Sequence, residues 1–212
     1  DQRIGNEIIK AQVDAYRRLR NTLRFLLGNL DGFDEAERLP LAEMPELELW
    51  VLHRLSELDE LTRKSCADFD FHRLYVALGN FCTNDLSAFY LDIRKDALYC
   101  DDAASIRRRA ARTVLDQVFS CLTAWLAPIL CFTAEEAWQA RFPDDDSVHL
   151  RQFPEIPDDW HNREVADRWA KVRTLRRVVT GALEVERKEK RIGASLQGHP
   201  TVYAPGEYLA AL

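Results

Sequence analysis

Residues 14–30 read DAYRRLRNTLRFLLGNL, and this stretch decides the fold class. Its apolar side chains recur at spacings of three and four residues, the period of one face of an α-helix. The side chains that we expect to form this buried stripe are Tyr16, Leu19, Leu23, Leu26 and Leu30. Turn-forming residues at 28–32 predict the end of the helix.

The same period continues outward from this helix as far as residue 142. Further helices are predicted over about residues 46–67 and 71–99, from the candidate caps at Asp101 and Asp102 to a bend or end at Pro128, and from Thr133 to about residue 141. In the helix over residues 71–99, the third of the chain, Ile93 is expected to be buried. The fourth helix has Asp101 and Asp102 as candidate caps, and its apolar stripe consists of Val114, Val118, Cys121 and Trp125. Thr133 followed by Glu136 predicts a capping box at the start of the last. Long helices with one apolar stripe each predict an all-α fold, an antiparallel helical bundle over residues 1–142, with Trp125 in its core.

The pattern changes at Pro143, so we predict a second domain over residues 143–212. This part has prolines, an Asp run at 144–146, a short extended piece near 148–153 and a long helix over 163–190. Residues 201–204 alternate like a strand. We therefore expect a linker, a long helix and the start of a small, incomplete α+β appendage. The chain lacks an initiator methionine, and we expect it to be a piece of a longer protein.

Composition excludes several classes of protein. The 212 residues are 47% hydrophobic and 30% charged, which excludes collagen-like and disordered chains. No apolar run reaches the roughly 18 residues of a membrane span. The five cysteines include no C-x-x-C pair and are expected as free, mostly buried thiols rather than zinc ligands. No nucleotide-binding, metalloprotease or hydrolase motif is present, so nothing in the residues indicates catalysis.

The net charge of −6 is unevenly distributed along the chain. Residues 31–70 carry twelve acidic and four basic side chains, a local charge of −8. Residues 10–24 have a local charge of +4, and residues 168–191 one of +6. Such segregation suits a protein with one face for a polyanion, although it also occurs in charged helical proteins without one.

The first helix carries the most informative basic residues. At 100° per residue, one face holds Arg17, Arg20, Asn21 and Arg24, roughly 130° from the leucine stripe, whereas Arg18 points elsewhere. Guanidinium groups bind phosphates in a bidentate manner, and an amide can read a base edge. A solvated face, or ion pairs with acids of a neighbouring helix, explains the pattern equally well.

Two other basic sets are open to both interpretations. The first set comprises Arg107, Arg108, Arg109 and Arg112 and lies at the start of the fourth helix. The helix dipole disfavours cations there, so we expect the acids Asp101 and Asp102 to offset these positive charges. The second set comprises Arg187, Lys188, Lys190 and Arg191 and lies at a helix C-terminus. The helix dipole favours cations there, but it explains only part of this concentration of basic residues.

Four segments resemble one family. Residues 14–30, 85–99 (DLSAFYLDIRKDALY) and 125–138 (WLAPILCFTAEEAW) resemble the anticodon-binding domain of isoleucyl-tRNA synthetases, class Ia enzymes of bacterial type. Residues 190–197 (KRIGASLQ) resemble the motif that follows that domain, with Gln197 where glutamate is commoner. The segments occur in family order and cover nearly the whole chain. The WLAP element is shared with valine, leucine and methionine enzymes, while the other pieces resemble isoleucine enzymes specifically.

The resemblance implies a cytoplasmic parent enzyme that joins isoleucine to its tRNA with ATP and Mg²⁺; many bacterial members of the family also carry zinc in a separate module. The signatures of the nucleotide-binding, editing and zinc parts are absent here, so this piece is expected to be non-catalytic and to need no cofactor. Its expected partners are the anticodon stem and loop of tRNA(Ile) and the rest of the same chain, with no membrane. The expected RNA-binding residues are Arg17, Arg20, Asn21, Arg24, Arg187, Lys188, Lys190 and Arg191.

Two other hypotheses remain open from the sequence. The chain is compatible with a helical protein-interaction scaffold that binds no nucleic acid. It is also compatible with the anticodon module of a valine, methionine or leucine synthetase, because these share part of the motif set.

Overall fold

A computed structural model describes residues 4–212, and over these residues it contains helices and loops but no strand, which confirms the all-α class. The chain divides into two compact units, one ending at His161 and the other beginning at Asn162. In the first unit the elements are α1 (Asn6–Leu30), η1 (Glu35–Glu37), η2 (Leu41–Glu43), α2 (Glu46–Ala67), α3 (Phe71–Asn80), η3 (Phe81–Leu91), α4 (Asp92–Cys100), α5 (Ile106–Leu126), α6 (Cys131–Arg141), η4 (Val148–Leu150) and η5 (Asp158–Trp160). In the second they are α7 (Arg163–Lys188), η6 (Ser195–Gln197) and α8 (Gly206–Leu209). No helix in the described part of the chain has both the length and the apolar character needed to cross a membrane.

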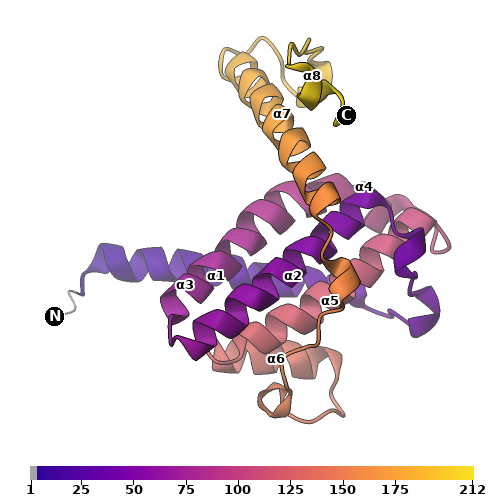
Figure 1. The fold of residues 1–212 in the computed structure, drawn as a ribbon. Coiled ribbons are helices and arrows are strands. Elements are labelled where there is room, and N and C mark those ends of the chain that lie inside the picture. Colours follow the sequence, from indigo (N-terminus) through magenta and orange to yellow (C-terminus); the bar gives the residue numbers. More distant parts are fainter. Residues whose placement is uncertain (1–3) are drawn as a thin grey trace. The chain divides into compact units, whose positions relative to one another are not determined.

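Helix α1, the first helix of the bundle in Figure 1, packs against α5, α6 and η3. It buries the leucine stripe predicted from the sequence. The four leucines of this stripe are buried, at 4% exposure or less. Tyr16 was expected to join them but is 36% exposed. Its hydroxyl lies 3.0 Å from the hydroxyl of Thr133 on α6, so the phenol stays at the edge of the core, where its polar end has a partner.

Helix α5 forms the centre of the bundle and contacts α1, α2, α4 and α6. Its predicted stripe is almost completely buried, and Trp125 has no exposed surface. The helix ends at Leu126, two residues before Pro128, as a proline requires. The prediction that Trp125 is a core residue is confirmed.

The predicted helix over residues 71–99 is divided into α3, the π-helical stretch η3 and α4. A π-helical turn hydrogen-bonds from residue i to i+5 and is wider than an α-helical turn. The face that follows it is therefore rotated relative to a regular 3.6-residue period. This explains why Ile93, expected inside, is 38% exposed, while Tyr90 is fully buried.

The predicted capping box at Thr133 is wrong. Helix α6 begins at Cys131, after Leu130, and no side chain caps its first turn. Thr133 is inside the helix and contacts Tyr16, and the carboxylate of Glu136 binds Arg20 of α1. The same pair of residue types therefore serves packing between helices rather than capping.

The cysteines are free, but only two of them are buried. Cys82 and Cys121 lie in the core, where burial raises the pKa of both thiols, that of Cys82 to about 12. Cys66 is half-buried. Cys100 and Cys131 are exposed because they lie at the end of α4 and the start of α6, outside the packed faces.

The expected α+β character of the C-terminal part is wrong. Residues 148–150 form a turn of 3₁₀ helix, and residues 201–204 are an irregular segment in which Tyr203 is 93% exposed. Alternation alone does not make a strand, because a strand needs a neighbour for its backbone hydrogen bonds and the described residues supply none. Residues 148–160 contact the bundle through η4 and η5, and the two units meet after His161, not after Phe142.

One buried polar cluster was not expected from the sequence. Glu48 of α2 has no exposed surface. Its carboxylate accepts two hydrogen bonds from the guanidinium of Arg94, at 2.6 and 2.7 Å, and one from the hydroxyl of Tyr90, at 3.0 Å. These three groups join α2 to η3 and α4 inside the bundle. Burial, followed by the neighbouring Glu48 charge, raises the pKa of the Tyr90 hydroxyl, so it remains a donor.

A histidine pair holds the end of the first unit against α2. The ring centroids of His53 and His161 lie 5.0 Å apart, and Nδ1 of His161 lies 3.5 Å from the hydroxyl of Ser56. His53 is 2% exposed, and its Nε2 lies 3.5 Å from a carboxylate oxygen of Glu57. Burial is the main cause that lowers the pKa of His53; His161 and Arg54 lower it further and Glu57 opposes them.

We expect the first unit to lose stability as the pH falls below about 6.5. The folded state disfavours protonated His53, so the unfolded state binds more protons in this range and the free energy of unfolding rises with pH. His53→Gln should remove part of this slope, which for one histidine is at most about 1.4 kcal/mol per pH unit. Urea unfolding of both proteins between pH 5 and 8 measures it. Identical slopes in the two proteins would contradict the assignment.

Candidate nucleic-acid interface

The predicted face of α1 is solvent-exposed along its length. The side chains of Arg17, Arg20, Asn21 and Arg24 are all exposed, since the helix turns its leucines toward α5 and α6. Arg17 lies at the N-terminal end of this strip, and its guanidinium is 3.4 Å from the carboxylate of Asp14. Both side chains of this pair are more than half exposed, so it contributes little stability and leaves Arg17 accessible to a phosphate.

One edge of the strip faces α6. The guanidinium of Arg20 donates two hydrogen bonds to the carboxylate of Glu136, at 2.6 and 2.8 Å. The hydrogen bond from Arg20 lowers the pKa of Glu136, so the pair is ionised. Arg24 borders the same small hollow of 180 Å³ and has no ion-pair partner among residues 4–212. The alternative of pairing with a neighbouring acid thus holds for Arg20 but not for Arg24.

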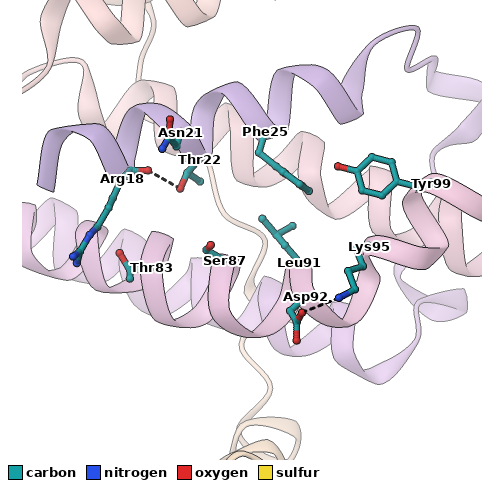
Figure 2. A pocket seen from close by; sticks show the side chains of 10 residues that line it. All are labelled: Arg18, Asn21, Thr22, Phe25, Thr83, Ser87, Leu91, Asp92, Lys95 and Tyr99. Atoms are coloured by element: carbon teal, nitrogen blue, oxygen red, sulfur yellow. Dashed lines mark hydrogen bonds and ion pairs between the residues drawn. The ribbon is translucent and has the colours of Figure 1, made fainter. Parts of the chain in front are cut away.

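The other edge of the strip borders a larger hollow of 460 Å³ between α1, η3 and α4 (Figure 2). Asn21 and Arg18 both line it, together with Thr83 and Ser87 of η3. Helical geometry placed Arg18 off the face. The structure places it beside Asn21 at one hollow, so Arg18 shares a site with a member of the predicted face.

The second basic cluster lies at the end of α7 and in the turn that follows. Arg187 pairs with Glu184, and Arg191 pairs with Glu186 and Glu189. Lys188 and Lys190 have no ion-pair partner within the described residues, and both line an open hollow of 390 Å³. Lys190 has a φ of +58°, at the point where the chain leaves the helix. The cluster therefore combines partly neutralised arginines with two available lysines.

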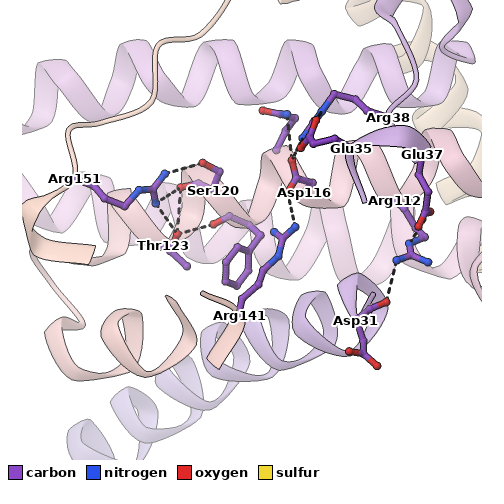
Figure 3. Close-up of polar contacts among 12 residues, drawn as sticks. Asp31, Glu35, Glu37, Arg38, Arg112, Asp116, Ser120, Thr123, Arg141 and Arg151 are labelled. Atoms are coloured by element: carbon purple, nitrogen blue, oxygen red, sulfur yellow. Dashed lines mark hydrogen bonds and ion pairs between the residues drawn. The ribbon is translucent and has the colours of Figure 1, made fainter. Parts of the chain in front are cut away.

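The arginines that open α5 have structural partners. Arg107 pairs with Asp101 at 2.6 Å, so Asp101 acts as a counter-ion; the helix is preceded by Ser105, and no side chain caps it. Arg109 donates to the carbonyl oxygen of Glu37. Arg112 donates to the carbonyl oxygen of Asp31 (Figure 3), and the two contacts hold the acidic connection on α5. These contacts favour the interpretation that this set stabilises the fold.

The same connection is held further along α5 by the carboxylate of Asp116. It accepts hydrogen bonds from Arg38 at 2.8 Å and from Arg141 of α6 at 2.6 Å (Figure 3). Both guanidinium groups also lie within 6 Å of the ring centroid of Phe33. Several of the acidic and basic residues that form charged segments in the sequence are therefore paired with each other inside the first unit.

The structure offers no metal centre among the residues it describes. The Asp run at 144–146 lies in an exposed loop, and no group of three or more His, Cys, Asp or Glu side chains is arranged to hold an ion in residues 4–212. The polar residues that η3 contributes to the larger hollow were not predicted from the sequence. Thr83 and Ser87 lie four residues apart, a spacing that puts both hydroxyl groups on one face of a helix, and this spacing was the available signal.

Comparison with known proteins places this arrangement in a family. Residues 48–202 match the family model of the anticodon-binding domain of tRNA ligases. Over its whole length the chain is 55% identical to an isoleucine–tRNA ligase of Agrobacterium fabrum and 57% identical to one of Ruegeria pomeroyi. Over 99% of its length it is 53% identical to the isoleucine–tRNA ligase of Brucella abortus strain 2308. The chain spans about a fifth of the length of these curated relatives, 22% in each case. The chain belongs to the family of anticodon-binding domains of tRNA ligases.

Proposed function

We propose that this chain is the module of an isoleucine–tRNA ligase that recognises the anticodon stem and loop of tRNA(Ile). The observation that carries the proposal is identity above 50%, over the whole chain, to ligases of that name. The exposed strip of α1 supports it, because single-stranded RNA loops are recognised by cationic, hydrogen-bonding and aromatic side chains.

The proposal divides the work between this chain and the rest of the enzyme. The parent protein ligates isoleucine to tRNA in the cytoplasm, using ATP and Mg²⁺ in a catalytic domain outside this chain. This chain contributes RNA binding, needs no cofactor and is not catalytic by itself. The unit that ends at His161 contains the anticodon-binding bundle, and residues 162–212 connect it to a C-terminal region of the same protein.

We assign roles to the exposed polar side chains by their partners. Arg17 and Arg24 hold phosphates of the anticodon stem, since neither is tied to a buried acid. Arg20 or Asn21 reads a base. The cluster of Arg187, Lys188, Lys190 and Arg191 holds further phosphates, with its two unpaired lysines as the first contacts.

Anticodon exchange tests the proposed function. Binding of the full-length enzyme to tRNA(Ile) would be compared with binding to the same tRNA carrying a valine or methionine anticodon. The proposal requires a clear preference for the isoleucine anticodon. Equal binding to all three would refute isoleucine recognition, and the absence of salt-dependent binding to any of them would favour a protein-interaction scaffold.

Arg17→Ala should weaken binding to all of these tRNAs by a similar factor. Removing one phosphate contact lowers the slope of log affinity against log salt concentration by about 0.7–0.9. Arg107→Ala is the matched control, because it removes the same charge from a guanidinium paired with Asp101. Filter binding between 50 and 300 mM KCl measures both slopes. If Arg107→Ala changes the slope and Arg17→Ala does not, the phosphate-binding face has been misplaced.

A further inference from the structure

The hollow between α1, η3 and α4 has two chemically different ends (Figure 2). Its volume of 460 Å³ is in the range of small-ligand sites. Arg18, Asn21, Thr83 and Ser87 form the polar end. Phe25, Leu91 and Tyr99 form the apolar end, bordered by the ion pair between Lys95 and Asp92 at 3.2 Å.

The apolar end suits a flat aromatic ring. The rings of Phe25 and Tyr99 are 6.5 Å apart, with an interplanar angle of 79°. Tyr99 is 66% exposed, so one of its faces is open to an incoming group. Bases that leave the stack in RNA loops are bound by aromatic side chains in this way.

The polar end contains hydrogen-bonding groups without partners. The side chains of Arg18, Asn21, Thr83 and Ser87 form no hydrogen bond or ion pair with any residue that the structure describes. By contrast, Arg20 on the same helix and Arg94 and Lys95 on α4 are all paired. Four polar side chains without a partner among the described residues therefore border one hollow, next to an aromatic wall.

The helix that forms one wall supports a binding role. Thr83, Ser87 and Leu91 all belong to the π-helical stretch η3, which includes eleven residues. Such stretches are rare and occur frequently at functional sites. Here the stretch supplies two hydroxyl groups and an apolar side chain to the same hollow.

We propose that this hollow binds one unstacked base of the anticodon loop. The base ring lies against Phe25, Leu91 and Tyr99, and its polar edge is hydrogen-bonded by the guanidinium of Arg18 and the amide of Asn21. This inference rests on the proposed function and adds to it a site for a single base, with Arg18 as a specificity residue. A segment of the parent protein filling the hollow is the competing occupant, and the experiment distinguishes the two.

The test is a double-mutant cycle between protein and RNA. Full-length enzyme is titrated with tRNA(Ile) transcripts in which one anticodon-loop nucleotide at a time lacks its base. For the wild-type enzyme, loss of the bound base should weaken binding by roughly tenfold. Loss of that same base should reduce the binding affinity far less in the variants Arg18→Ala, Asn21→Ala and Tyr99→Leu, because the contact with the base is already missing. Arg24→Ala, on the opposite edge of the strip, is the control and should retain the full loss.

The outcomes separate the inference from the proposed function. If the wild-type enzyme prefers the isoleucine anticodon but no loop position couples to Arg18, Asn21 or Tyr99, the base site is refuted and the function stands. If the wild-type enzyme has no anticodon preference, the function itself fails. If Arg18→Ala and Tyr99→Leu lower the melting temperature without affecting the cycle, the hollow is covered by the parent protein. The altered side chains of Arg18, Asn21 and Tyr99 are exposed, so all three variants are expected to fold.

Discussion

Trp125→Ala should lower the free energy of unfolding by about 3–5 kcal/mol. Trp125 has no exposed surface and lies on α5, which contacts four other helices of the bundle. Removing the indole leaves a cavity that several helices would have to fill together, and close-packed interiors relax only partly. Urea unfolding followed by circular dichroism measures the loss.

Trp125→Phe is the matched control for this experiment. The indole Nε1 is buried and has no hydrogen-bond acceptor in the described part of the chain. Phenylalanine keeps most of the ring and removes this unsatisfied donor, so its cost should stay below about 1.5 kcal/mol. If Trp125→Ala unfolds like the wild type but no longer binds tRNA, the indole contacts RNA and its assignment to the core is wrong.

Arg94→Met should cost a similar amount, about 3–5 kcal/mol, for an electrostatic reason. Methionine keeps the aliphatic part of the side chain but leaves the carboxylate of Glu48 without its counter-ion. Glu48 is completely buried, and the remaining hydrogen bond from Tyr90 does not neutralise its charge. Thermal and urea unfolding of the variant at pH 7 measure the loss.

Two further variants identify the cause of that loss. Lys95→Met breaks the exposed pair with Asp92 on the same helix and should cost less than about 1 kcal/mol. Adding Glu48→Gln to Arg94→Met should restore part of the stability, because a neutral amide is less costly to bury than a carboxylate. Additive losses in this double variant would show that Arg94 contributes through packing alone.

The helical elements of the bundle could be predicted because they depend on local periodicity. The predicted boundaries of the helix over residues 46–67 agree with α2, and the leucine stripe of α1 is buried as expected. The stop before Pro128 follows from backbone geometry alone. Each of these features is determined by residues within a few turns of one another.

The features that could not be predicted depend on contacts between distant segments. Glu48 reads as an ordinary acid at a helix start, yet it is buried because Arg94, far along the chain, reaches it. The π-helical stretch leaves no mark in a 3.6-residue pattern, so Ile93 was placed on the wrong face. The hollow beside Asn21 needs side chains from three helices, and the position of Arg18 in it could not be seen from one helix.

The pair between Arg20 and Glu136 has a consequence for how selectively α1 would bind RNA. The carboxylate already occupies the two donor positions that a phosphate or a base edge would use. An incoming RNA group at this position must therefore displace an internal competitor, and only a well-placed group gains from the exchange. Under the proposed function, the Glu136 carboxylate of α6 thus competes with RNA for the guanidinium of Arg20. This competition reduces non-specific binding of polyanions at Arg20.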